Sequence, residues 1–331
     1  MAINSQASRD GILETHLRTY GNALTKFRAD RVFKTSLVDD FTGVFMEVDD
    51  AFGAAEQDLD FFRSQLGAYP EIPFDVSEQT GWNLDDMGIQ YSVDQKAARR
   101  LAGRATMVDA VRHFGRIALN VLMLRRERLA ATRAFDTTAA SSASRSVTLT
   151  APDQVDNESS QLIKNIDTWL LAFADAQGLD ANCVTMNEKV ALSIARHPGI
   201  IEYLSRTQGV PGTLATTQDM TPLEQRMAQV FKVAKANVCS AKYNSAQPGQ
   251  TRSLARVWGD HILLAYQPDA IVEGEPNGAA VRWQLRGGDQ QTVRRWQSQG
   301  GLVEHRSISY DEEFWMDSSW DEAYLIVNAH S

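Results

Sequence analysis

Apolar side chains recur every three or four residues through the middle of the chain and predict one very long helix. The interval 95–135 contains no proline, and its apolar residues keep this spacing at Met107, Val111, Phe114, Ala118 and Val121. About thirty residues of helix would be roughly 45 Å long. We expect such a helix to cross the whole molecule.

Alternating apolar and polar residues predict strands early and late in the chain. The early segments are 42–48 and 88–94, and the late ones are 281–285, 302–310 and 323–328. A further strand is expected at 146–151, after the long helix. The two early segments are about 40 residues apart, which fits a long excursion better than a compact hairpin. The late strands are expected to return to the sheet that the early strands begin.

Residues 152–270 mix helical and apolar segments and are expected to form an α/β unit. A helix from Leu162 should end at Gly178, because glycine is typical of helix C-termini. After a strand at 182–186, Asn187 is a good N-cap for the next helix. The remaining expectations are helices from Pro198 and from Pro222 to Phe231, a strand within 257–269, a loosely helical arm at 7–33, and a loop at 136–145.

Charge is segregated along the chain. The 331 residues carry a formal net charge of −9. Residues 38–94 hold 14 acidic side chains and one basic side chain, a net of −13, whereas residues 96–145 hold 11 basic and three acidic side chains, a net of +8. Adjacent segments of opposite sign suggest that they pair with something.

Composition excludes several classes of protein. A hydrophobic content of 43% is too high for a disordered chain, and no apolar run approaches the length of a membrane helix. No secretory signal is visible at the N-terminus. Two cysteines, Cys183 and Cys239, cannot form a disulfide framework, which suits a reducing compartment. The acidic total argues against nucleic-acid binding by the whole surface.

The chain lacks the common catalytic and phosphate-binding motifs, and no histidine pair has metal-ligand spacing on a helix. Cys183 and His197 could be a nucleophile and base, but a buried cysteine and a helix-end histidine explain them better. We therefore expect no enzyme activity, no cofactor and no metal site.

Three further groups have a functional and a structural interpretation. An acidic tail could hold a cation or be a solvated or interface-facing charge run, and four tryptophans could stack on a ligand or pack in a core. The basic helix residues could contact nucleic acid, or they could pair with acidic residues of the same or a neighbouring subunit. We favour the pairing with acidic residues. The groups are Asp311, Glu312, Glu313, Asp317, Asp321 and Glu322; Trp283, Trp296, Trp315 and Trp320; and Arg112, Arg116, Arg125, Arg126 and Arg128.

The order of elements resembles a known family. GIQYSVDQKAAR closes the excursion, LMLRRERLAATRAF ends the long helix, and the α/β unit contains NCVTMNEKVALSIARHPGIIEYL and then VWGDHILLAYQP. This order, over roughly residues 35–330, resembles the major capsid proteins of tailed double-stranded DNA phages, which have the Hong Kong 97-type fold.

The resemblance implies an α+β fold with five parts. They are an N-terminal arm (1–37), an extended loop or E-loop with its base (38–94), a peripheral domain with a spine helix (95–151), an axial domain (152–270), and C-terminal strands that return to the peripheral and axial sheet (271–331).

The resemblance also implies a function. The chain would assemble into hexamers and pentamers of an icosahedral phage head around double-stranded DNA, bound without sequence specificity. It would be found in the virion after assembly in the host cytoplasm, with a portal, a decoration protein and no membrane. About 35 residues precede the excursion, so a separate scaffolding protein or a removed precursor segment is expected. The alternatives are an encapsulin-type nanocompartment shell and an intracellular α/β enzyme.

Contacts between subunits are expected where the two charged segments meet. The acidic residues of the excursion would lie across the basic spine helix of a neighbour. The residues concerned are Asp49, Asp50, Glu56, Asp58 and Asp60 on one side and Arg112, Arg116, Arg125, Arg126 and Arg128 on the other.

Overall fold

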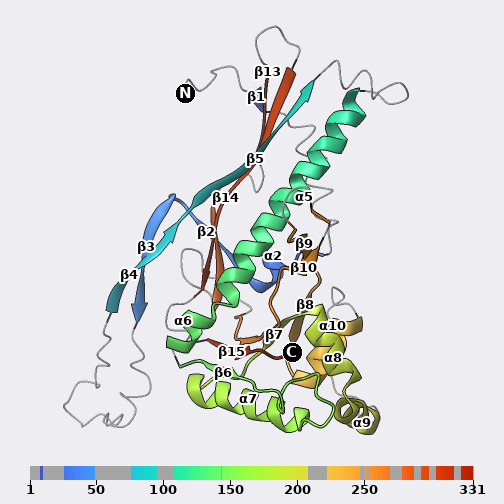
Figure 1. Cartoon of the computed structure of the whole chain (residues 1–331). Coiled ribbons are helices and arrows are strands. Elements are labelled where there is room, and N and C mark those ends of the chain that lie inside the picture. The colour runs from blue at the N-terminus through green and yellow to red at the C-terminus, as the bar shows by residue number, and fades with distance from the viewer. Residues whose placement is uncertain are drawn as a thin grey trace, which may run out of the picture.

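One long helix organises the structure (Figure 1). The computed structural model describes residues 8–9, 26–48, 76–94, 107–142, 144–207, 222–246, 250–251, 253–268, 278–286, 292–297, 303–316 and 322–330. The helix, α5, spans Met107–Ala134, and its 28 residues make it about 42 Å long. The predicted helix is therefore confirmed over this range, and residues 95–106 lie outside the described part of the chain.

A six-stranded sheet packs along α5. Its strands run in the order β1 (Ser8–Arg9), β13 (Thr292–Gln297), β14 (Val303–Met316), β12 (Ala280–Leu285) and β2 (Lys34–Val38), and β5 (Asp85–Asp94) also pairs with β14. The late strands β12 and β14 therefore pair with the early strands β2 and β5, as predicted, whereas the late segment 323–328 belongs to another sheet. Ile308 lies opposite both Ile89 and Val293, and this row packs against Leu119 of α5.

Two strands form a separate ribbon that projects away from the helices (Figure 1). They are β3 (Thr42–Val48) and β4 (Val76–Asn83), paired in antiparallel fashion. The strand predicted at 42–48 is confirmed, but its partner is β4, whereas the strand predicted at 88–94 belongs to β5 and pairs with β14. The polar sequence VSEQTGWN of β4 has no strand-like alternation. Residues 49–75, the middle of the predicted excursion, lie outside the described residues.

A five-stranded sheet with its helices forms the other half of the molecule. The strand order is β6 (Ser146–Thr148), β15 (Ala323–Val327), β11 (Ile262–Ala265), β7 (Cys183–Asn187) and β8 (Lys235–Cys239). The helices are α7 (Leu162–Gln177), α8 (Glu188–Arg196), α9 (Pro198–Thr207) and α10 (Pro222–Phe231). The α/β unit expected at 152–270 is thus completed by strands from outside that range.

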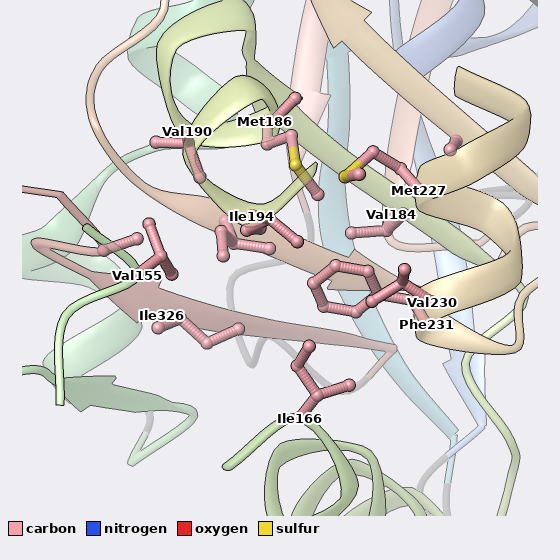
Figure 2. Packing of buried hydrophobic residues seen from close by; sticks show 14 of the residues in the cluster. Val155, Ile166, Val184, Met186, Val190, Ile194, Met227, Val230, Phe231 and Ile326 are labelled. Atoms are coloured by element: carbon pink, nitrogen blue, oxygen red, sulfur yellow. The ribbon is translucent and has the colours of Figure 1, made fainter. Parts of the chain in front are cut away.

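Both faces of the five-stranded sheet are buried. Val184, Met186 and Ile326 point into the core formed with the helices, and Phe231 of α10 lies among them (Figure 2). On the other face, Leu263 and Leu325 pack with small alanines of α5 and α6. Burial on two faces explains why the two central strands β11 (ILLA) and β15 (AYLIV) are continuous apolar runs.

Local sequence signals fixed several element ends as predicted. Gly178 ends α7 in the left-handed conformation, with φ 65°. The Asn187 side chain caps α8 by accepting a hydrogen bond from the Val190 amide at 2.8 Å. α9 begins at Pro198, where the missing amide donor costs nothing.

Two expectations differ from the structure. The predicted loop at 136–145 contains a short helix, α6 (Thr137–Ser142), because the Asp136 side chain accepts from the amides of Thr138 and Ala139 and starts a turn. In the predicted helical arm at 7–33, Ser8–Arg9 is a strand paired with β13, and the described helix is the four-residue α2 (Ala29–Val32). Among the described helices, none combines the length and apolarity needed to cross a membrane.

Candidate functional site

The five arginines predicted on the spine helix do not share one environment. Arg116, Arg125 and Arg128 are exposed, Arg112 is half-buried, and Arg126 is buried. The Arg128 guanidinium lies 4.6 Å from the centre of the Tyr243 ring. The helix therefore presents exposed basic groups to solvent, with Arg126 as the exception.

Apolar residues continue the exposed face of α5. Ile117 is 48% exposed and Val121 is 51% exposed, and both lie on the face of the helix that carries Arg125 and Arg128. We call these four residues the outer stripe. The two aliphatic side chains lie one helical turn apart and form a small apolar row beside charged groups.

Arg126 is part of an ion cluster that is buried except at Asp30, whose side chain is 51% exposed. Its guanidinium donates to both carboxylate oxygens of Glu312, one at 2.6 Å, and to Asp30 at 2.9 Å. Arg282 pairs with the same Asp30. The cluster joins α5 to β14, β12 and α2, so Arg126 binds within its own chain. The expected contact between subunits is accordingly withdrawn for this residue.

Glu127, the next residue of α5, is also buried and has different partners. Its carboxylate accepts from the amides of Arg28 and Ala29 and, at 2.6 Å, from the indole of Trp258. Burial raises the pKa of Glu127, and these hydrogen bonds oppose the shift. The Arg28 side chain in turn pairs with the buried Glu224 of α10 at 2.9 Å. α2 is thereby tied to both halves of the molecule.

The acidic side of the predicted contact is described only in part. Asp49, Asp50, Glu56, Asp58 and Asp60 lie outside the described residues. Of the other acidic residues in 38–94, Asp39 pairs with Arg286 at 2.8 Å, and Asp86 of β5 lies directly opposite Asp311 of β14. Partial burial and Asp86 raise the pKa of Asp311.

The residues considered for catalysis are not assembled for it. Burial raises the pKa of the Cys183 thiol to about 11, which disfavours the nucleophilic thiolate. His197 is buried and bonded to Ser160 and to the backbone around Asn157 and Gly199. Within the described part of the chain, no cluster of acidic, histidine or cysteine side chains has the arrangement of a metal site.

The acidic tail and the tryptophans have structural partners where they are described. Glu312 belongs to the buried ion cluster, and Glu313 accepts from the Asn83 amide at 2.6 Å. Trp283 and Trp315 pack against each other with ring centroids 6.4 Å apart. Asp317, Trp320 and Asp321 lie outside the described residues, as does the side chain of Trp296.

Sequence comparison finds a phage relative. No protein-family model matches the chain. The "Major capsid protein" of Pseudomonas phage JBD67 is 24% identical over 197 residues, which are 60% of this chain and 58% of that protein. The chain thus matches less than two thirds of the length of this relative.

Solved structures share the fold over nearly the whole chain. A phage-related protein from Bordetella bronchiseptica RB50 superposes with a TM-score of 0.70 at 19% identity, over 98% of each chain. The holo-SrpI encapsulin from Synechococcus elongatus PCC 7942 has a TM-score of 0.53 at 12% identity, over 92% of this chain and 88% of that one. The capsid of cyanophage P-SCSP1u has a TM-score of 0.51 at 11% identity, over 89% and 86%. The chain therefore has the Hong Kong 97-type fold of phage capsid proteins.

Proposed function

We propose that this chain is the major capsid protein of a tailed phage and that its work is geometric, with no catalysis. The observation that carries the proposal is the sequence relative, a phage major capsid protein, taken together with a capsid fold over the whole chain. In this proposal, copies form hexamers and pentamers of an icosahedral head that encloses double-stranded DNA. Residues 38–94 are the extended loop, residues 95–151 the peripheral domain and residues 152–270 the axial domain.

The surface of the subunit supports an assembling protein. The outer stripe leaves Ile117 and Val121 about half exposed, and a neighbouring copy would remove them from water. The ribbon of β3 and β4 projects from the subunit, and a two-stranded ribbon is marginally stable by itself. Both features favour contacts between unlike surfaces of identical copies, the kind that closes into rings.

The charges of the two segments indicate which surfaces of neighbouring copies meet. The acidic excursion of one copy lies across the outer stripe of the next, so that Asp49, Asp50, Glu56, Asp58 and Asp60 face Arg125 and Arg128. Arg112 and Arg116, which were also expected in this contact, project from other sides of α5. A single exposed ion pair contributes about 0–1 kcal/mol, so the effect depends on a network repeated over many copies. Salt should weaken the assembly for the same reason.

A charge reversal tests this contact. The double substitution Arg125→Glu with Arg128→Glu should lower the yield of particles much more than it lowers the unfolding midpoint of the free chain, in which Arg128 contacts Tyr243. The matched control is Arg125→Lys with Arg128→Lys, which keeps the charge. Equal particle yield and equal salt sensitivity in the two doubles would show that the stripe does not make this contact.

The proposed function itself is tested by particle size and contents. The full chain, expressed alone and with its gene neighbours, should give closed particles of megadalton mass in sedimentation and electron microscopy. A stable monomer or dimer that turns over small substrates would favour the enzyme alternative and overturn the proposal.

An encapsulin-type shell is the second candidate, because the SrpI encapsulin has the same fold over most of both chains. The contents of the particles separate the two functions. A genome, with a portal and a terminase encoded nearby, supports a phage head located in the virion. An enzyme cargo with a docking tail supports a nanocompartment. A scaffolding protein and a decoration protein are further expected partners of a phage head.

A further inference from the structure

The ribbon is attached to the six-stranded sheet through a small apolar cluster. Where β2 leads into β3 and β4 leads into β5, four buried residues form its centre and three partly buried ones surround it. We call this cluster the ribbon root; its residues are Val38, Leu84, Val281 and Trp283, with Trp82, Leu285 and Trp315 around them.

Trp82 connects the ribbon to the sheet. It belongs to β4, but its ring packs on Trp283 of β12, with centroids 5.0 Å apart and planes inclined by 34°. Its indole nitrogen donates to the carbonyl of Asp40 at 3.1 Å. One side chain of the ribbon therefore contacts both the sheet and the turn that precedes β3.

Gly43 makes room for this ring. Gly43 is paired with Trp82 in the ribbon, and the register shifts between Gly43 and Val44. A Cβ atom at Gly43 would lie 2.0 Å from a ring carbon of Trp82, far inside van der Waals contact. The indole thus lies directly on the glycine backbone, beside the register shift of the ribbon.

The two backbone amides that follow Trp82 are also hydrogen-bonded at the ribbon root. The Leu84 amide donates to the Phe41 carbonyl at 2.8 Å, and the Asn83 amide donates to Glu313 at 2.6 Å. Beyond the root, the strand partners of β3 and β4 in the described part of the chain are each other. The direction of the whole ribbon is consequently set at the root.

We propose that Trp82 is a positioning residue that fixes the angle at which the ribbon leaves the subunit. The indole acts as a wedge between the Gly43 backbone and Trp283, and it holds the ribbon in the direction needed to reach the neighbouring copy. The angle is a property of the single chain, whereas its use in reaching a neighbour rests on the proposed function.

Spin-label distances in the full, unassembled chain test the angle. One label is placed at Ser77 in β4 and the other at Ser141 on the exposed side of α6, since the two native cysteines are buried. The wild type should give one narrow distance distribution. Trp82→Ala should broaden it at least twofold, Trp82→Phe should keep it narrow, and Gly43→Ala should shift its mean, because the added methyl group displaces the ring.

The outcomes separate a positioning role from a purely structural one. If Trp82 only adds stability, Trp82→Ala lowers the unfolding temperature but leaves the distribution as narrow as in the wild type, and the proposal is overturned. A broad distribution in the wild type overturns it as well. Failure of the wild type to form particles would count against the proposed function and leave these widths unaffected.

Discussion

Arg126 and Glu127 are consecutive residues of α5, yet each is bound to a different half of the molecule. Arg126 pairs with Glu312 of the six-stranded sheet, whereas Glu127 accepts from Trp258, which packs beside Leu263 of the five-stranded sheet. Successive side chains leave a helix about 100° apart, so one turn can serve two sheets. These two adjacent residues therefore bond α5 to both halves of the molecule within one helical turn.

Removing Arg126 should unfold the subunit more readily than removing its exposed neighbour. Arg126→Met leaves the buried Glu312 without its main cation, and breaking such a pair costs about 3–5 kcal/mol. The control Arg125→Met removes an exposed charge on the same helix and should change the free energy of unfolding by less than about 0.5 kcal/mol. Urea denaturation measures both. Similar losses in the two variants would contradict the buried ion cluster.

Glu127 should make stability depend on pH. Because burial raises its pKa, the carboxyl holds its proton more tightly in the folded chain than in the unfolded one. Its contribution is therefore full below the unfolded pKa of about 4.3 and is lost as the pH rises through the folded pKa.

The comparison with Glu127→Gln isolates this contribution. The free energy of unfolding of the wild type, minus that of the variant, should fall as the pH rises from about 4 to 7. Urea titrations at a series of pH values give the difference. A difference that grows with pH would mean that the carboxylate is stabilised by its hydrogen bonds more than it is destabilised by burial.

Asp311 and Asp86 should repel each other across β14 and β5. Like charges directly opposite on paired strands are destabilising, so Asp311→Asn should raise the free energy of unfolding near pH 7, on the order of 0.5 kcal/mol. The pKa of Asp311 is raised in the fold, so the wild type gains stability as the pH falls through that pKa. The difference in free energy of unfolding between the variant and the wild type should therefore disappear in acid. Asp153→Asn, at an exposed loop position, is the control. If the difference in free energy of unfolding is the same at all pH values, repulsion between Asp311 and Asp86 is not its cause.

Asn187 should not tolerate aspartate, although both residues are good helix caps. Its amide nitrogen donates to the Gly259 carbonyl at 2.9 Å and to the Asp260 carboxylate at 2.5 Å. An aspartate would keep the hydrogen bond from the Val190 amide, but its second oxygen would face these two acceptors. We expect Asn187→Asp to cost about 1–3 kcal/mol in thermal or urea unfolding.

The matched control is the cap of α6. Asp136 only accepts hydrogen bonds, from the amides of Thr138 and Ala139, so Asp136→Asn should be nearly neutral. If Asn187→Asp and Asp136→Asn change the free energy of unfolding equally, the hydrogen bonds donated by Asn187 do not contribute to stability.

Elements with local signals were predictable, and elements held by distant partners were not. α8 has its cap at Asn187, its end before Pro198 and a clear apolar spacing, and it forms as expected. β2 reads KTSLV, with little alternation, and becomes a strand by pairing with β12, far away in the sequence. Such pairing leaves no trace in the sequence of β2 alone.

The buried charges show the same limit. In the sequence RRER, Arg125, Arg126 and Arg128 look alike, and the partners of Arg126 lie at Asp30 and Glu312, far along the chain. One signal did point to its burial. Arg126 follows Leu119 by two turns and precedes Ala130 by one, which places it on the apolar side of the helix. Helical phase, more than residue type, separates structural arginines from exposed ones.

The position of β15 has a consequence for the timing of folding. This strand, made of residues 323–327, lies between β6 and β11, so the five-stranded sheet has a gap until those residues pair. Pairing across so long a separation in sequence is slow, so this sheet closes late in folding. Until it closes, β6 and β11 each have an unpaired edge, and an unpaired strand edge can pair with another chain.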